Sequence, residues 1–420
     1  MLNLRILAVV IAAFILLPAS AQVSFQTTIN LAAGSGDETR ETSAIVAADF
    51  DGDTDADLVV ANRNTGEIVL LVNNGSGIFA RTTPVNVGSR PVSLVAADLN
   101  DDDALDLAVA LLAEDEVVVL LGTGDGSFLA PTPFLVGDAP QHLAAGDINN
   151  DGLLDLVTAN EQDDTVSLLI GNGDGTFATA VNETVAVTDG GTRSEPNGTA
   201  IGDFNGDGLG DLAVALAARD EVGVLIQNAN GTFREMVRDT VGRDPTFVLA
   251  ADLDGDAHLD LIVANTTDDS VSVLTGDGFG DFALSGTFDA GNNPEALALA
   301  DLDGDTNLDL VTADREGDTV SVLLGAGDGT FGSATSFDVG GAPTDVVVAD
   351  FNADADLDIA TANQEGSVGQ AADDVSVLLS GLPIGPDFGD CGQGCGPAGL
   401  TPVALSLLGL VGMKRARRMP

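Results

Sequence analysis

The chain has 420 residues, and 66 acidic against 15 basic side chains give it a formal net charge of −51. Such an excess of negative charge repels phosphate backbones, so nucleic acid is excluded as an expected partner. It also strains a compact fold through self-repulsion, which bound cations would relieve. Both cysteines follow residue 380, so disulfides cannot stabilise the chain before that point.

The amino end has the three parts of a secretory signal. Arg5 provides a short basic start, residues 6–17 form an apolar run, and Ala19-Ser20-Ala21 provides a small-residue cleavage site. At about twelve residues the apolar run is too short to span a bilayer. We therefore expect residues 1–21 to be a signal peptide that directs export.

A nine-residue acidic pattern then occurs seven times, at a spacing of 49 residues in every interval but one. Positions 1, 3, 5 and 9 are Asp or Asn in all seven copies. Oxygen ligands at alternate positions of a tight loop suit calcium, which takes six to eight oxygens at about 2.3–2.6 Å. A fixed period with one such loop per unit predicts a repeat architecture. The copies begin at Asp49, Asp98, Asp147, Asp203, Asp252, Asp301 and Asp350.

Each unit has the pattern of four short strands. A strand such as Val92–Ala97 leads into the acidic loop, and an almost continuously apolar strand such as Leu105–Ala110 leaves it. A polar turn and a third strand such as Val117–Leu121 follow, and then a glycine-rich turn that ends in Phe. Four antiparallel strands per unit, packed against neighbours on both sides, predict the blades of a β-propeller.

The ends of the repeat region complement each other. Phe25 begins a segment that resembles the fourth strand of the other units, whereas the seventh unit stops after its third strand, Val375–Leu379. The first segment can complete the last blade and so remove exposed sheet edges. We predict an all-β fold, a seven-bladed propeller over residues 22–380 that is closed by its amino-terminal strand.

The loop pattern, together with GDGTF-type turns at blade spacing, resembles the FG-GAP or VCBS repeat family, whose best-known member is the integrin alpha-chain propeller. The resemblance covers roughly residues 23–380. It implies one calcium per loop, up to seven, held by the side chains of positions 1, 3, 5 and 9 and the backbone carbonyl of position 7. The implied ligands are Asp49, Asp51, Asp53, Asp55 and Asp57; Asp98, Asn100, Asp102, Ala104 and Asp106; Asp147, Asn149, Asp151, Leu153 and Asp155; Asp203, Asn205, Asp207, Leu209 and Asp211; Asp252, Asp254, Asp256, His258 and Asp260; Asp301, Asp303, Asp305, Asn307 and Asp309; and Asp350, Asn352, Asp354, Asp356 and Asp358.

Other loop families fit less well. An EF-hand requires a bidentate Glu at position 12, where the first loop has Val60, and calcium β-rolls repeat every nine residues. Glycine, which suits a sharp turn, occupies position 6 only at Gly152 and Gly208, so equal affinity at all seven sites is not expected. Solvated acidic turns without metal are the alternative.

The sequence gives little support for an enzyme, and we expect none. The two histidines are His142 and His258, and the second stands at position 7 of a loop, where its side chain should face solvent. No Ser/His/Asp constellation can be identified. The chain also lacks Trp and Tyr, so an aromatic-platform lectin is not expected, and the Phe residues of the turns and loops are interpreted as structural.

Arginine is distributed unevenly. Of the ten arginines in the repeat region, seven map to the face opposite the acidic loops: Arg40, Arg63, Arg90, Arg193, Arg219, Arg243 and Arg315. The one long insertion, near residues 188–196, maps there too. We hypothesise that this face binds a carboxylated or sulfated ligand through Arg193, Arg219 and Arg315. The alternative is that these arginines only offset nearby acids.

Residues 381–420 differ in composition from the repeats. A Gly/Pro-rich linker contains Cys391 and Cys395, and an apolar run over 402–413 precedes a basic end that begins at Lys414. This order resembles bacterial C-terminal sorting signals of the PEP-CTERM and MYXO-CTERM kind. The resemblance implies transient membrane contact, cleavage and surface attachment; a disulfide between the two cysteines is the alternative.

Taken together, the sequence predicts an exported, calcium-binding propeller at a bacterial cell surface or outside the cell. Its expected role is adhesion or interaction with an extracellular protein or glycan. An extracellular hydrolase or lyase acting on polysaccharide ranks second, and a structural surface-layer component ranks third. The sequence does not identify the ligand or the oligomeric state.

Overall fold

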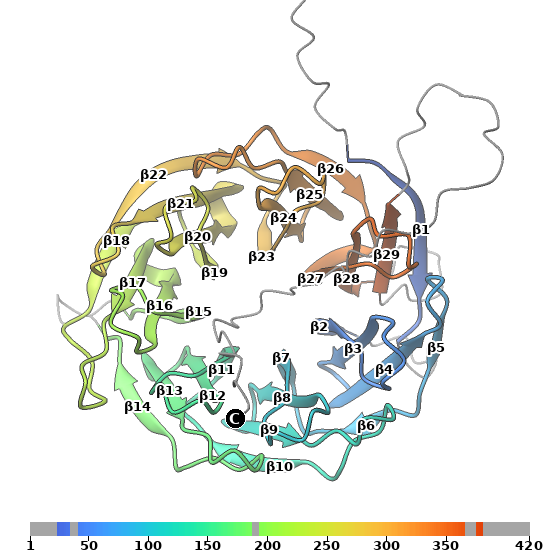
Figure 1. Cartoon of the computed structure of the whole chain (residues 1–420), viewed down its shortest axis with the longest axis horizontal. Helices are drawn as coiled ribbons and strands as arrows, with labels where there is room; N and C mark the ends of the chain where they lie inside the picture. The colour runs from blue at the N-terminus through green and yellow to red at the C-terminus, as the bar shows by residue number, and fades with distance from the viewer. Residues whose placement is uncertain (1–22, 34–40, 187–192, 366–374, 381–420) are drawn as a thin grey trace, which may run out of the picture.

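The computed structural model describes residues 23–33, 41–186, 193–365 and 375–380. These residues form a closed ring of seven antiparallel sheets, each with its first strand at the centre of the ring (Figure 1). The predicted seven-bladed, all-β propeller is confirmed. The predicted signal peptide, the carboxyl-terminal segment with Cys391 and Cys395, and Arg40 lie outside the described residues.

The strands of the first four blades follow one another in sequence. Blade 1 contains β2 (Thr42–Ala48), β3 (Asp57–Asn62), β4 (Glu67–Asn73), β5 (Phe79–Arg81) and β6 (Val85–Asn86); blade 2 contains β7 (Pro91–Ala97), β8 (Asp106–Leu111), β9 (Glu116–Leu120) and β10 (Thr132–Leu135); blade 3 contains β11 (Pro140–Gly146), β12 (Asp155–Asn160), β13 (Thr165–Leu169) and β14 (Val181–Thr184); and blade 4 contains β15 (Pro196–Gly202), β16 (Asp211–Leu216), the 3-10 turn η1 (Ala217–Arg219), β17 (Glu221–Leu225) and β18 (Val237–Thr240).

The remaining blades keep this order until the ring closes. Blade 5 contains β19 (Pro245–Ala251), β20 (Asp260–Asn265), η2 (Thr266–Asp268), β21 (Ser270–Gly276) and β22 (Phe282–Asp289); blade 6 contains β23 (Pro294–Ala300), β24 (Asp309–Asp314), β25 (Thr319–Leu323) and β26 (Thr335–Asp338); and blade 7 contains β27 (Gly341–Ala349), β28 (Asp358–Glu365), β29 (Val375–Ser380) and β1 (Phe25–Leu31).

Closure occurs as predicted, through the amino-terminal strand. β1 pairs antiparallel with β29, with Ile29 opposite Val377, and gives blade 7 its fourth strand. The two segments lie side by side in Figure 1, although the whole propeller separates them in sequence. Phe25 also makes an edge-on contact with Phe337 of blade 6, with ring centroids 4.8 Å apart. The first segment therefore joins the last blade to the blade before it.

Two details differ from the sequence prediction. The second strand of each blade begins at the ninth loop position, so β8 starts at Asp106 and not at Leu105. The fourth strand of blade 1 is divided, because β5 and β6 pair with β4 on either side of Pro84. The same interruption occurs in blades 3, 4 and 6, where Phe177, Phe233 and Phe331 form isolated bridges before the fourth strand begins and no proline follows them.

The hydrophobic core lies between the blades. All six residues of β8 are buried, as are those of the second strands in the other blades up to blade 6. Val59 of blade 1 packs in one cluster with Leu94 and Leu107 of blade 2. Similar clusters fill the other interfaces between neighbouring blades, which we call seams. Near the central axis of the ring, the backbones of neighbouring inner strands lie close together. A Cβ on Gly198 of β15 would lie 2.8 Å from the Cα of Phe247 of β19.

The ring has two distinct faces. The acidic loops and the glycine turns lie together on one face, which we call the loop face, since the N–H of Gly126 donates to the carbonyl of Phe50. The turns between second and third strands and the blade-to-blade connections form the opposite face, which we call the arginine face. Within the described residues, no helix is long and apolar enough to cross a membrane.

Deleting residues 23–31 should expose the edge of β29 and both destabilise and oligomerise the protein, because an unpaired edge recruits other strands. We expect the melting temperature to fall by about 5 °C or more and larger species to appear on size-exclusion chromatography. The conservative replacement Ile29→Val is the control and should behave as the parent. A deletion variant with unchanged melting and a monomeric profile would contradict the closure.

Candidate metal centre

The seven acidic loops share one backbone conformation. Positions 4 and 6 have positive φ in every loop, for example 82° at Gly52 and 79° at Thr54 in the first. The N–H of position 6 donates to Oδ2 of position 1, at 2.8 Å for Gly152 and Asp147. The N–H of position 7 donates to Oδ1 of position 5, at 2.9 Å for Leu153 and Asp151. These bonds recur in all seven loops and hold the carboxylates of positions 1 and 5 against the backbone of their own loop.

The ligand positions differ in exposure in a regular way. In the first loop Asp53 at position 5 is exposed, Asp49 and Asp51 at positions 1 and 3 are half-buried, and Asp57 at position 9 is buried. The other six loops repeat this gradient. Each site is therefore open to solvent at position 5, and an ion could enter from that side.

Position 9 fixes the base of every loop. Both carboxylate oxygens of Asp106 accept a backbone N–H, Oδ2 from Leu99 at 2.9 Å and Oδ1 from Gly122 at 2.7 Å. The same pair of bonds occurs in all seven blades. Leu99 belongs to the acidic loop and Gly122 begins the glycine turn, so one carboxylate joins the two turns of a blade. Each oxygen has a second lone pair, which leaves it able to bind a metal.

Burial makes this carboxylate difficult to ionise without a cation. It raises the pKa of position 9 to about 6 in six loops, from an ordinary value of 3.8, and the two N–H donors only partly oppose the effect. The pKa of Asp260 is raised for the same reason. A divalent cation in the loop would favour the charged form.

The donor sets fit a calcium ion by chemistry and by size. Three loops bring carboxylate oxygens from three residues within 4.8 Å of one another: Asp49, Asp51 and Asp53; Asp252, Asp254 and Asp260; and Asp301, Asp303 and Asp309. Two oxygens bound to one Ca²⁺ can be at most about 5.2 Å apart. The other four loops have Asn at position 3 and so contribute one charge fewer there. The residues present would thus hold calcium through oxygen alone.

The loops are also coupled to the seams between blades. Position 2 of one blade contacts the glycine turn of the next, and the rings of Phe50 and Phe128 meet edge-on with centroids 5.9 Å apart. Phe204 with Phe282, and Phe351 with Phe79, repeat the contact. The interpretation of these Phe residues as structural is confirmed. An ion that orders a loop would therefore also support the adjacent seam.

Sequence reasoning missed the role of position 4. It takes positive φ in all seven loops and is glycine in four of them, Gly52, Gly206, Gly255 and Gly304. Asp101 and Asn150 stand there in two others, and Asp and Asn tolerate this conformation better than most residues. That composition was a readable signal. It shows that each loop needs two left-handed residues, of which the sequence analysis identified only position 6.

The histidines have different surroundings. The side chain of His258 is exposed, as predicted. His142 lies on the inner strand β11, accepts the N–H of Thr199 at Nδ1 at 3.3 Å, and contacts the ring of Phe247 edge-on at 4.8 Å. Burial lowers the pKa of His142 to about 4, so it is neutral at pH 7. It thus bridges the inner strands of blades 3, 4 and 5.

The three arginines proposed as ligand contacts have partners within the chain. Arg315 forms an ion pair with Glu295 at 2.7 Å and also donates to Gln364. Arg193 lies 3.9 Å from a carboxylate oxygen of Asp164. Arg219 donates to the carbonyl of Arg193 at 3.2 Å. These contacts favour the alternative that the three arginines offset nearby acids and connect loops.

The fold and the loops together define a β-propeller with one acidic, metal-type loop in each blade. The family model described as FG-GAP-like repeat matches residues 49–109, 105–158, 147–214, 203–263, 252–312 and 301–361, and the chain belongs to this family. No curated protein matches the chain.

Solved structures support the fold. BBS1N in complex with ARL6DN is 14% identical with a TM-score of 0.59, and the match covers 86% of this chain and 97% of that one. An Agrocybe aegerita lectin that recognises non-reducing terminal N-acetylglucosamine is 23% identical with a TM-score of 0.51, covering 71% and 80%. The periplasmic gluconolactonase PpgL of Pseudomonas aeruginosa is 16% identical with a TM-score of 0.54, covering 72% and 86%. At these identities the likeness concerns the fold alone.

Glycine at position 6 should stabilise a loop, and its loss should destabilise one. We expect Ala257→Gly, at φ 73°, to raise the free energy of unfolding by about 1 kcal/mol, and Gly152→Ala, at φ 86°, to lower it by a similar amount. No atom lies within 4 Å of the added Cβ at Gly152, so the second change tests the backbone alone. Denaturant unfolding measures both variants, and shifts of the same sign would contradict the account.

The metal-free protein should lose stability as the pH rises from about 4 to above 6. The folded pKa of position 9 exceeds the ordinary value, so the folded chain binds more protons than the unfolded chain in this window, and raising the pH favours unfolding. Bound calcium should reverse this pH dependence, so that stability rises with pH, because calcium binding requires the charged form of the position-9 carboxylate. Thermal melts at pH 4.5 and 7, with calcium removed or added, measure both slopes. A metal-free protein that melts higher at pH 7 would contradict this assignment.

Proposed function

We propose that this chain is an exported, calcium-binding propeller that acts as an adhesion or interaction module at a bacterial surface or outside the cell. The single observation that carries the proposal is the sevenfold repetition of one loop geometry, with its inward carboxylates and its buried ninth position. A motif kept for one reaction would be confined to one or two blades. A motif repeated in every blade serves the whole ring.

Calcium in these loops would have two physical effects. Seven divalent ions would add roughly +14 to a chain of net charge −51 and so reduce its self-repulsion. They would also hold the positions 1, 3 and 9 that connect each loop to its blade. The extracellular setting expected from the amino-terminal segment is one where calcium is abundant.

The arginine face is the proposed recognition surface. The loop face would be occupied by metal, whereas the four-residue turns of the arginine face in blades 1 to 6 differ in sequence and charge. BBS1N was solved in complex with ARL6DN, and the Agrocybe aegerita lectin recognises a sugar. Propellers of this shape thus include binding proteins, which supports an interaction role here.

The second candidate is an enzyme acting on extracellular polysaccharide. The observation in its favour is the residue two positions after the inner-strand proline, which differs around the axis and includes His142, Phe247 and Asp345. The gluconolactonase PpgL shows that the fold can hold a lactonase. The carboxylate of Asp345, however, accepts the N–H of Ile45 at 2.9 Å, and His142 bridges blades, so both groups have structural roles. Turnover of polysaccharide that is lost in His142→Ala would favour the enzyme.

Calcium titration tests the proposed function. We expect up to seven ions per chain by calorimetry, and a higher melting temperature when calcium is bound. Replacing Asp254 and Asp256 together with Ala should remove one ion and lower the melting temperature of the calcium form. Asp125→Asn is the matched control, since Asp125 is an exposed acid of a glycine turn. Failure of calcium to bind or to stabilise the parent chain would overturn the proposal.

A further inference from the structure

A carboxylate closes the arginine face of five consecutive seams. In each, an Asp in the turn between the second and third strands accepts the backbone N–H of the residue just before the inner-strand proline of the next blade. The N–Oδ1 distances are 2.9–3.0 Å. The pairs are Asp115 with Ala139, Asp164 with Glu195, Asp220 with Asp244, Asp269 with Asn293, and Asp318 with Ala342. The fold therefore binds a carboxylate at the same place in every seam from blade 2 to blade 7.

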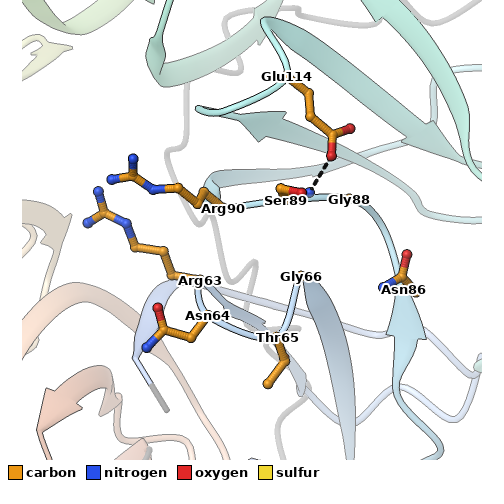
Figure 2. Close-up of a pocket in the computed structure, with 9 residues that line it drawn as sticks. All are labelled: Arg63, Asn64, Thr65, Gly66, Asn86, Gly88, Ser89, Arg90 and Glu114. Atoms are coloured by element: carbon orange, nitrogen blue, oxygen red, sulfur yellow. Dashed lines mark hydrogen bonds between the residues drawn. The ribbon is translucent and has the colours of Figure 1, made fainter. Parts of the chain in front are cut away.

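The seam between blades 1 and 2 has no such carboxylate. Gly66 takes the place of the Asp, with φ 69°, and a Cβ there would lie 2.3 Å from the carbonyl oxygen of Gly88. The backbone N–H of Arg90 is the counterpart of that of Ala139, and no described residue accepts it. A hollow of about 290 Å³ lies at this seam, lined by residues of both blades (Figure 2).

Two arginines line the hollow. Arg63 comes from the turn of blade 1 and Arg90 from the connection to blade 2, and Figure 2 shows their guanidinium groups next to each other. Neither guanidinium has an ion-pair partner in the described part of the chain, whereas Arg238, Arg243 and Arg315 each pair with an acid. Burial lowers the pKa of Arg63 and the charge of Arg90 lowers it further, whereas the charges of Glu41 and Glu295 oppose these effects. The two adjacent guanidinium groups thus have acids nearby but no direct ion-pair partner among the described residues.

The one acid that lines the hollow has another partner. Glu114 accepts the N–H of Ser89 at 2.8 Å and so holds the connection to blade 2. Other seams contain the same contact, since Asp163 accepts the N–H of Asp138 at 3.3 Å and Asp268 that of Arg243 at 2.8 Å. Glu114 is therefore part of the seam. With two guanidinium groups and one carboxylate, the hollow has a net positive charge.

We propose that this seam binds an oxyanion, the carboxylate or sulfate group of an extracellular ligand, between Arg63 and Arg90. One oxygen accepts the N–H of Arg90, as Oδ1 of Asp115 accepts that of Ala139 in the next seam. The remaining oxygens accept from the guanidinium groups, whose planar forks match carboxylate and sulfate. The ligand thus supplies the anionic oxygen that Gly66, having no side chain, does not provide. This inference rests on the proposed recognition role of the arginine face, and it does not depend on calcium.

Calorimetry on the full chain tests the site, with sodium sulfate and sodium glucuronate as probes. Sodium chloride at equal ionic strength and glucose are the controls. We expect saturable binding of at least one of the two oxyanions, at one site per chain. Arg63→Gln and Arg90→Gln should each weaken that binding at least tenfold. Arg234→Gln removes the same charge from an exposed position on a glycine turn and should leave binding unchanged.

The two probes distinguish the sources of the anion. Binding of sulfate alone identifies a sulfated ligand, and binding of glucuronate alone identifies a carboxylated one. Binding of neither, or an equal loss in all three glutamine variants, would overturn the site. If a glutamine variant melts lower than the parent, Arg63→Lys and Arg90→Lys keep the charge without the fork and should still weaken binding. Calcium titration tests the proposed calcium-binding role separately. A failure to bind oxyanions therefore does not contradict calcium binding, and a failure to bind calcium does not contradict the oxyanion site.

Discussion

The structure depends on a buried carboxylate at the ninth position of each acidic loop. Its two oxygens accept N–H groups from two different turns, as Asp106 does from Leu99 and Gly122, so it fixes both turns at the start of the second strand. Burying a charge is costly unless hydrogen bonds and an opposite charge accompany it. The hydrogen bonds are present in all seven blades. The half-buried Asp at position 1 and the Asp or Asn at position 3 would hold the opposite charge beside it.

This local constraint extends around the ring because the blades have no separate cores. Val59 packs against Leu94 and Leu107 of the next blade, and Phe50 of an acidic loop contacts Phe128 of the neighbouring glycine turn. Ordering one loop therefore supports two blades. Pairing of β1 with β29 makes the chain of contacts continuous, so no blade has an unsupported side. On the opposite face a second set of carboxylates, such as Asp115, closes the seams without metal.

The repeated features of the fold could be predicted from the sequence, and the features of single seams could not. The spacing of the loops, the apolar second strands and Phe25 indicated the blades and their closure, because they depend on periodicity. The guanidinium groups of Arg63 and Arg90, which form no ion pair with a described residue, could not be told from the paired group of Arg315, because pairing depends on the turn of the adjacent blade. The sequence shows Gly66 where the turns of blades 2 to 6 have Asp. That this leaves a hollow at the seam could be seen only from the structure, which places Gly88 opposite Gly66.

The most direct test of the account is a crystal structure of the calcium-loaded protein, with calcium located by its anomalous scattering. We expect peaks in the acidic loops, between the side chains of positions 1, 3, 5 and 9, with the strongest where position 3 is Asp. We also expect the position-9 carboxylates to keep both backbone N–H donors. Loops without anomalous peaks at saturating calcium would contradict the account and make the repeated acids a property of surface charge alone.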